Sequence, residues 1–226
     1  IAAAREIVAT KGLFITKKRY AVLYYDVEGK RTDVDGKAGK IKAMGLDLKR
    51  SDTPVVIQDF LSQVLEKVLA GKEQQEVLDY ITEFRTEFKT RPGWEKGSPR
   101  RANNIGEYAK KEARQGKANM PGHVRASINW NTLKRMNSDK YSQEIMDGMK
   151  VIVCKLKKNP LEYTSVAYPT DELRLPQWFK ELQFDDATME STVIDNKLGN
   201  LLGVLGCDIK STESNNTFNN LFDFGG

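Results

Sequence analysis

The sequence predicts an α+β protein, with a small β segment near the N-terminus, a mainly helical body with a little sheet, and a flexible tail. Three observations predict it: an alternating segment near the start, two apolar stripes at helical spacing over 53–89, and two short apolar runs within 150–169. The 226 residues are 39% hydrophobic, which suffices for one substantial core or two small ones. Because the first residue is Ile1 and not Met, we expect the chain to begin inside a longer polypeptide or to follow processing.

The N-terminal region predicts a helix followed by a strand. Residues 1–11 have the composition of a short helix closed by Gly12, and residues 13–30 alternate as a β-strand does. This strand begins with basic side chains and ends with apolar and aromatic ones. We therefore expect its first end to be exposed to a partner and its second end to be buried, with a hairpin or loop over 27–39.

Two amphipathic helices follow, and their stripes predict a helical hairpin. Thr53 is a suitable cap, Pro54 fits the first helical position, and Gly71 ends the first helix. The second helix extends over 73–89 and ends before Pro92-Gly93. The apolar positions that predict this packing are Val56, Phe60, Val64, Leu65, Val68 and Leu69 in the first helix and Val77, Ile81, Phe84 and Phe88 in the second.

The segment 91–135 is strongly basic, with eleven Lys or Arg against three Glu and no Asp, whereas the whole chain has a net charge of only +5. Such a local surplus favours a polyanion such as nucleic acid, and the alternative is a solvated charged face without a partner. Its Gly, Asn and Pro content predicts long loops around short helices. Beyond it we expect strands at 150–156 and 163–169, a helix behind Pro176 and a disordered stretch at 211–220.

The two cysteines, Cys154 and Cys207, have neither the spacing of a disulfide framework nor that of a metal site, which predicts a reducing, cytoplasmic setting. No apolar run approaches the roughly 20 residues of a membrane span. The acidic residues near the hairpin, among them Asp33 and Asp35, lack the rigid placement that a two-metal site demands.

The tetrapeptide Lys17, Lys18, Arg19 and Tyr20 is the first candidate contact with nucleic acid. Alternation places Lys17 and Arg19 on one face and Lys18 and Tyr20 on the other, so a groove contact combined with a backbone contact suits it. The alternative is an exposed strand end whose charges prevent edge pairing.

Five motifs occur in the order seen in the C-terminal region of T-even-type phage DNA polymerases of family B, which this sequence resembles over nearly its whole length. They are KKRYAV, GLDLKRSDTP, RANNIGEY, GHVRA and a terminal LFDF. The resemblance implies the end of the palm at 1–48, the thumb at 49–210, and a flexible tail with a clamp-binding peptide at 211–226. It also implies a setting in the cytoplasm of an infected bacterial host cell.

The resemblance implies contacts to the primer-template duplex. Asn103 and Asn104 are candidates for hydrogen bonds to phosphate or sugar, although a turn pair bonded to its own backbone is the alternative. His123, the only histidine, lies with Arg125 in a second matching loop and is expected to contact DNA or to pack. The full set of implied DNA contacts is Lys17, Lys18, Arg19, Tyr20, Lys49, Arg50, Ser51, Asn103, Asn104, His123 and Arg125.

The palm aspartates of that family, in a tyrosine-aspartate-threonine-aspartate motif, are absent, as are the nucleotide-binding helix of the fingers and the exonuclease carboxylates. The sequence thus predicts no catalytic and no metal residue here, and a chain that does not polymerise alone. Mg²⁺ and dNTP are expected for the complete polymerase, with an upstream polymerase part as partner. Whether the chain is a natural split product or a fragment stays open, and a stand-alone DNA-binding or scaffold module is the rival hypothesis.

The C-terminus predicts a second partner. Leu221, Phe222 and Phe224 form a compact apolar group behind an Asn-rich tether, and in the resembling family such a peptide binds the sliding clamp. Here Gly225 and Gly226 follow, which departs from the family's usual ending. The alternative is that the rings fold back onto the chain's own core.

Overall fold

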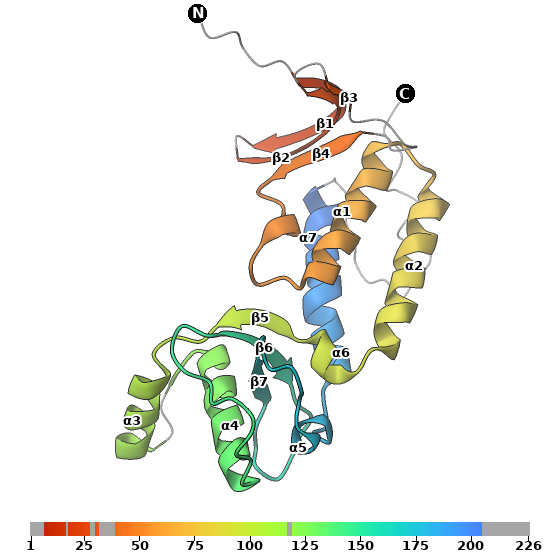
Figure 1. The fold of residues 1–226 in the computed structure, drawn as a ribbon. Coiled ribbons are helices and arrows are strands. Elements are labelled where there is room, and N and C mark those ends of the chain that lie inside the picture. The colour runs from red at the N-terminus through yellow and green to blue at the C-terminus, as the bar shows by residue number, and fades with distance from the viewer. Residues whose placement is uncertain (1–6, 17, 28–29, 32–38, 117–118, 205–226) are drawn as a thin grey trace, which may run out of the picture. The chain divides into compact units, whose positions relative to one another are not determined.

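A computed structural model describes residues 7–16, 18–27, 30–31, 39–116 and 119–204 (Figure 1). Its helices and two small antiparallel sheets confirm the α+β class. The chain divides into two compact units, the first comprising residues 1–50, 55–87 and 194–226, the second 51–54 and 88–193. The assignment of 1–48 to a palm and 49–210 to a thumb stays a prediction.

The first unit contains a sheet in which β2 (Arg19–Val27) is central. It pairs with β1 (Ile7–Thr16) along one edge, and along the other with β3 (Lys30–Arg31) and β4 (Lys40–Met44), all antiparallel. Ala21 and Leu23 of β2 are buried, whereas Lys18 and Arg19 are exposed. The predicted change from an exposed to a buried end of the strand is thus confirmed.

The predicted N-terminal helix is wrong in its described part, because residues 7–16 form β1. The segment begins with β-branched Ile7 and Val8, and β1 pairs along its whole length with β2, so long-range pairing overrides local helix preference. Gly12 does not end a helix but lies opposite Val22. The single strand predicted over 13–30 is in fact two strands, since β1 ends at Thr16 and β2 begins at Arg19.

The helical hairpin is confirmed in α1 (Val55–Leu69) and α2 (Gln74–Thr90). The rings of Phe60 and Phe84 stack with centroids 4.0 Å apart, which joins the two stripes. Gly71 ends α1 in the left-handed region at φ +71°, and the N–H of Lys72 donates to the carbonyl of Lys67 as in a Schellman motif. Pro54 precedes the first helical residue rather than occupying it. Helix α1 also contacts η1 (Asp47–Lys49), β2 and α7 (Asn196–Val204).

The second unit is built on a three-stranded antiparallel sheet in the order β5-β6-β7. Strands β6 (Lys150–Lys155) and β7 (Ser165–Pro169) confirm the two predicted strands, and β5 (Ser98–Arg101) is an addition. The unit also contains η2 (Gly93–Lys96), α3 (Ile105–Gln115), α4 (Gly122–Met136), α5 (Gln177–Lys180) and α6 (Asp186–Glu190). The π-helix η3 (Ser191–Asp195) begins in this unit and ends in the first. The helix expected behind Pro176 is α5.

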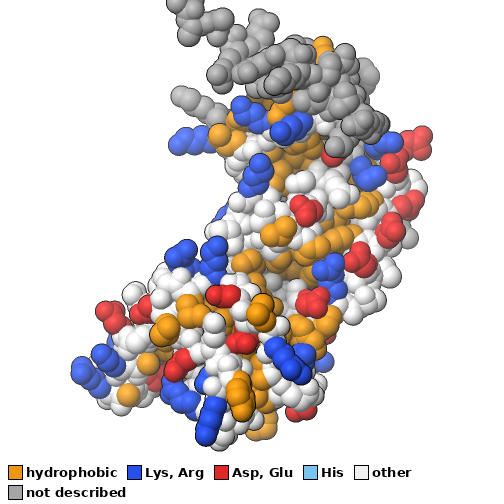
Figure 2. All heavy atoms as spheres, in the orientation of Figure 1, with side chains coloured by type: hydrophobic (Ala, Val, Ile, Leu, Met, Phe, Trp, Pro, Cys, Tyr) orange, Lys and Arg blue, Asp and Glu red, His pale blue; other side chains and the backbone are white. Residues whose placement is uncertain are grey.

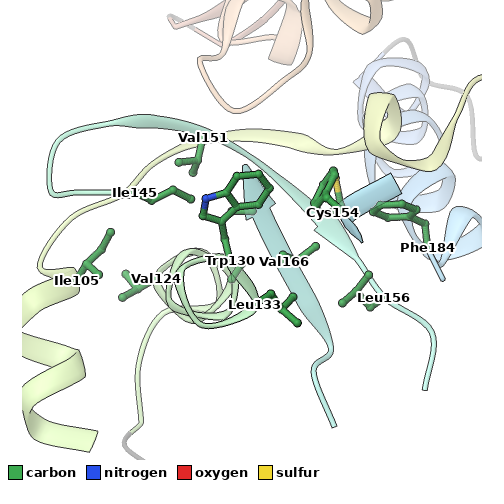
Figure 3. Close-up of a cluster of buried hydrophobic side chains, with 14 of the residues drawn as sticks. Ile105, Val124, Trp130, Leu133, Ile145, Val151, Cys154, Leu156, Val166 and Phe184 are labelled. Atoms are coloured by element: carbon green, nitrogen blue, oxygen red, sulfur yellow. The ribbon is translucent and has the colours of Figure 1, made fainter. Parts of the chain in front are cut away.

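Helix α4 corrects the prediction of short helices in the basic segment, because it runs for 15 residues against β6 and β7. Trp130 of α4 is fully buried and points toward the sheet, where Val151, Cys154 and Val166 lie (Figure 3). Its indole N–H donates to the carbonyl of Gln143 at 2.9 Å. The core of the second unit therefore includes α4 and side chains from both faces of the sheet, because alternation along β6 places Val151 and Cys154 on opposite faces and both are buried.

Candidate nucleic-acid interface

The basic start of β2 is exposed. Lys18 and Arg19 are exposed and Tyr20 is half-buried. Gly45, with φ +70°, lies so close to the backbone carbonyl of Lys18 that a side chain there would collide with it. The end of β4 is thereby held against the Lys18-Arg19 turn. Lys17 lies outside the described residues.

An exposed face of the first sheet extends this basic site in a way that the sequence analysis missed. Tyr20 lies opposite Met44 of β4, and Val22 lies opposite Lys42, so the four side chains share one face. On the other edge Phe14 lies opposite Tyr20, with ring centroids 6.0 Å apart and nearly parallel planes. Phe14 is 74% exposed and Met44 of the same face is 50% exposed, so both present apolar surface to solvent.

The sequence of β4 could have predicted this face, because alternation along the strand places Lys40, Lys42 and Met44 on one side. All three are exposed, whereas Ile41 and Ala43 between them are half-buried. We call Phe14, Tyr20, Lys40, Lys42 and Met44 the basic-aromatic face. Its combination of cations and aromatic or thioether groups suits phosphate and sugar contacts better than it suits a purely solvated surface.

Lys49 and Arg50 are exposed at the end of η1, near the first sheet. The amide of Gln58 in α1 donates to the carbonyl of Arg50 at 3.1 Å and fixes the backbone there. Both residues line a cavity of about 860 Å³ that also includes Lys40 and Met44. The structure thus brings Lys49 and Arg50 to the same part of the first unit as β4.

Ser51 belongs to the second unit, together with the two Asn residues. Ser51, Asn103 and Asn104 are exposed. Asn104 adopts the left-handed conformation at φ +59° directly before α3, and its side chain forms no capping hydrogen bond. The carboxylate of Asp147 instead accepts from the N–H of Ile105 at 2.6 Å, so the Asn104 amide is not used as a helix cap.

His123 and Arg125 lie in the first turn of α4, which corrects the expectation of a loop. His123 is half-buried; burial lowers its pKa below 6.5, and the charge of Arg100 lowers it further. The guanidinium of Arg125 forms an ion pair with Glu112 of α3. Arg125 therefore joins two helices, and a phosphate would have to share it with Glu112.

Arg100 of β5 is a residue that the sequence analysis did not single out. Its guanidinium pairs with Asp52 at 2.9 Å, next to predicted Ser51, and its charge acts on His123. It therefore connects two predicted contacts that lie 72 positions apart in the numbering of the sequence. Only the tertiary structure could reveal this, because no local pattern relates the two segments.

The surplus of positive charge in 91–135 is partly neutralised. Lys96, Arg100, Arg125 and Arg135 each form an ion pair with a carboxylate. Figure 2 shows Lys and Arg side chains gathered over α3. Of the exposed cations in the described part of this segment, Arg100 and Arg135 are paired, whereas no ion pair is formed by Arg101, Lys110, Lys111 and Arg114. The charge that remains available to a polyanion is concentrated on β5 and α3.

Within the described ranges no group of three or more His, Cys, Asp or Glu is arranged to hold a metal ion. The described helices also include none that is long and apolar enough to cross a membrane. The described residues thus do not fit a Mg²⁺ site.

The family model for DNA polymerase family B matches residues 4–170. The chain belongs to DNA polymerase family B. Over 160 residues, 70% of this chain, it is 30% identical to the DNA-directed DNA polymerase of Enterobacteria phage T4 and 31% identical to that of Escherichia phage RB69. These 160 residues are 17% of each phage polymerase, so this family B chain spans about a sixth of its curated relatives.

The family match includes every predicted DNA contact of this family B chain, from Lys17 to Arg125. The predicted clamp-binding residues Leu221, Phe222 and Phe224 lie beyond the match and outside the described residues, as does Cys207. The assignment to the family thus depends on the segment that carries the basic sites, and the clamp-binding role of the tail stays a prediction.

Proposed function

We propose that this chain is the duplex-binding part of a family B DNA polymerase, which holds primer-template DNA while catalytic aspartates on an upstream polymerase part extend the primer. The observation that carries the proposal is the basic-aromatic face beside exposed Lys18 and Arg19. Cations there would neutralise phosphates, and Phe14 and Tyr20 would contact sugars or bases. Such contacts are independent of DNA sequence, as a replicative polymerase requires.

The residues of this chain suit binding of the DNA backbone, and the catalytic groups would be on the upstream polymerase part. Asn103, Asn104 and Ser51 offer neutral hydrogen-bond donors on the second unit, and they would orient the backbone without adding charge. The chain lacks the family's catalytic motif, so Mg²⁺ and dNTP would bind to the upstream polymerase part. Holding the duplex would position the primer terminus, which lowers the entropic cost of the reaction on that part.

We further propose that Leu221, Phe222 and Phe224 tether the polymerase to its sliding clamp. Short aromatic anchors on flexible tethers gain effective concentration from the attachment, so even a weak contact would retain the enzyme on DNA. Removing residues 221–226 should leave duplex affinity unchanged and should shorten the products that the chain and the upstream polymerase part make together in the presence of the clamp.

Duplex binding can be tested by fluorescence anisotropy with a primed template at low ionic strength. The double substitution Lys18→Gln and Arg19→Gln should weaken binding. A matched control, Lys157→Gln and Lys158→Gln, removes the same charge from two exposed lysines of the second unit. Equal losses in the two variants would mean that net charge alone, and not the proposed face, governs binding.

Primer extension separates this function from the rival of a stand-alone DNA-binding or scaffold module. Mixing the chain with an upstream part that holds the palm aspartates, fingers and exonuclease should restore extension, and neither part should extend a primer alone. If the mixture is inactive although both parts are folded and this chain binds DNA, the stand-alone module becomes the better explanation.

A further inference from the structure

A cavity of about 410 Å³ in the second unit is lined by three nitrogen-bearing side chains: Arg100, His123 and Lys155. The hydroxyl residues Ser98 and Thr192 also line it. Among the described residues that line it there is no carboxylate. We call it the cationic cavity. His123 is one of the predicted DNA contacts, whereas Arg100 and Lys155 are not among them.

The sheet register explains why the two permanent cations meet there. Ser98 and Arg100 alternate on β5, and Ser98 lies opposite Val153 of β6. Two residues further along β6, Lys155 lies opposite Ser165 of β7. Residues two apart in a strand, and residues opposite each other, project from the same face, so Arg100 and Lys155 belong to one side of the sheet.

Helix α4 contributes the third group. It begins at Gly122, preceded by Pro121, which provides no side-chain cap. The first-turn N–H groups carry the positive end of the helix dipole, and His123 lies in this turn. Added to the side-chain cations, this end of the helix makes the cavity more favourable for an anion.

The charges of the cationic cavity are only partly offset by their neighbours. A hydrogen bond from Thr188 and, to a smaller extent, the charge of Lys155 lower the pKa of the Asp185 carboxyl, which is not among the residues that line the cavity. Asp52 pairs with one end of the Arg100 guanidinium at 2.9 Å, and a guanidinium has five N–H donors in all. Lys155 is exposed and, within the described part of the chain, forms no ion pair with a carboxylate. The described residues that line the cavity therefore offer hydrogen-bond donors but no carboxylate that would accept from them.

We propose that the cationic cavity binds a phosphodiester group of the duplex DNA that the chain holds. Arginine, lysine and hydroxyl groups are the donors that recognise phosphate oxygens, and the cavity has room for the adjoining sugar atoms. This inference rests on the proposed function, because the duplex supplies the phosphate. It assigns Arg100 and Lys155 as phosphate contacts on the second unit, in addition to the predicted set.

The test uses Lys155→Gln, with Lys158→Gln as a control that removes the same charge from an exposed lysine outside the cavity. Binding of a short DNA duplex is measured by anisotropy over a range of KCl concentrations. The loss of one phosphate contact should weaken binding in Lys155→Gln and reduce the slope of log affinity against log salt by about 0.9. Lys158→Gln should behave nearly as the unchanged chain.

His123 supplies a local reporter, because it is the only histidine. Its ring signals in the NMR spectrum of the whole chain should shift on addition of the duplex and, at higher concentration, of inorganic phosphate. Both shifts should be reduced in Lys155→Gln and retained in Lys158→Gln. This second measurement does not depend on catalytic activity.

The remaining outcomes contradict the cavity proposal, and one of them also contradicts the proposed function. If the duplex binds but leaves the His123 signals unchanged, or if both variants lose affinity equally, the cavity proposal is wrong while duplex binding stands. If inorganic phosphate shifts the His123 signals but the duplex does not, the cavity binds a free anion and not the DNA backbone, which also overturns the proposal. A folded chain without duplex affinity at low ionic strength would refute the proposed function as well.

Discussion

Single side chains of the second unit derive their properties from burial and from neighbouring charge. His123 combines both influences, since partial burial disfavours its charged form and Arg100 repels the added proton. Lys96 shows the opposite solution: it is 2% exposed, and its ammonium is 3.0 Å from Glu190 and 3.5 Å from Asp186. The buried charge is compensated by carboxylates and by the carbonyl of Lys89 at 3.1 Å.

We expect NMR titration of His123 to give a pKa below 6.5, and Arg100→Gln to raise it. The increase should be incomplete, because burial is the larger cause and remains. Since the folded pKa lies below the unfolded one, the unfolded chain binds the proton more readily. This group therefore favours folding above about pH 6.5, and that contribution declines as the pH falls from there through the lowered pKa. A measured pKa above 6.5 would contradict this description.

Replacing Lys96 by Met should lower the free energy of unfolding by about 2–3 kcal/mol. This is less than the cost of breaking a fully buried ion pair, because Asp186 is half exposed. The cause is the uncompensated charge of Glu190. Urea denaturation measures the effect, and Lys72→Met, at an exposed pair with Glu76, should change stability little. Adding Glu190→Gln to Lys96→Met should restore part of the loss; no recovery would indicate that packing of the lysine stem is responsible.

At the scale of elements, buried amides fasten α4 to its surroundings. Asn129 donates to the carbonyl of Ser165 in β7 at 2.8 Å. Asn131 donates to the carbonyl of Ile145 at 2.9 Å and accepts from its N–H at 2.8 Å. Asn is a poor helix former in isolation, yet these bonds form only when α4 is helical and docked. This is why an Asn-containing segment that predicts loops becomes a long helix.

Asn131→Leu should cost about 1–3 kcal/mol, because both backbone groups of Ile145 lose their partner in a buried position. The free energy of unfolding in urea gives the magnitude, and hydrogen exchange at the Ile145 amide should accelerate. Asn137→Ala, at the exposed end of α4, is the matched control and should cost less. Unchanged exchange at Ile145 would show that the two bonds do not hold this segment.

At the scale of the whole molecule, affinity for DNA depends on how the charge is distributed and not on its sum. The net charge is only +5, and several cations of the basic segment are occupied by carboxylates. Exposed cations on the first sheet, on β5, on α3 and at Lys155 of β6 are among those that a duplex could contact. A long polyanion that contacts many such sites releases many counterions.

Duplex affinity should therefore fall steeply as KCl is raised, with a slope of about −0.9 for each phosphate neutralised. It should also differ little between duplexes of unrelated sequence. Anisotropy with two such duplexes at several salt concentrations measures both properties. Salt-insensitive or strongly sequence-selective binding would argue for a recognition module instead of a polymerase grip.

The sequence by itself determined the features that short-range pattern encodes: the α+β class, the α1–α2 hairpin, strands β6 and β7, and the basic character of 91–135. The motifs from KKRYAV to GHVRA also indicated the family, which the match over 4–170 confirms. These predictions are correct because the periodicity of a helix or strand can be read within a contiguous stretch of the chain, and so can the order of the motifs.

Only the tertiary structure decided the nature of β1, the length of α4, the pairing of Arg125 with Glu112 and the meeting of Arg100, His123 and Lys155. Each depends on groups far apart in sequence. Strand pairing and buried hydrogen bonds contribute free energy only once distant segments are in contact, so they can override the local preference of residues such as Ile7 or Asn131. The charges of a sequence can be counted in advance, but which of them remain available to DNA is decided by folding.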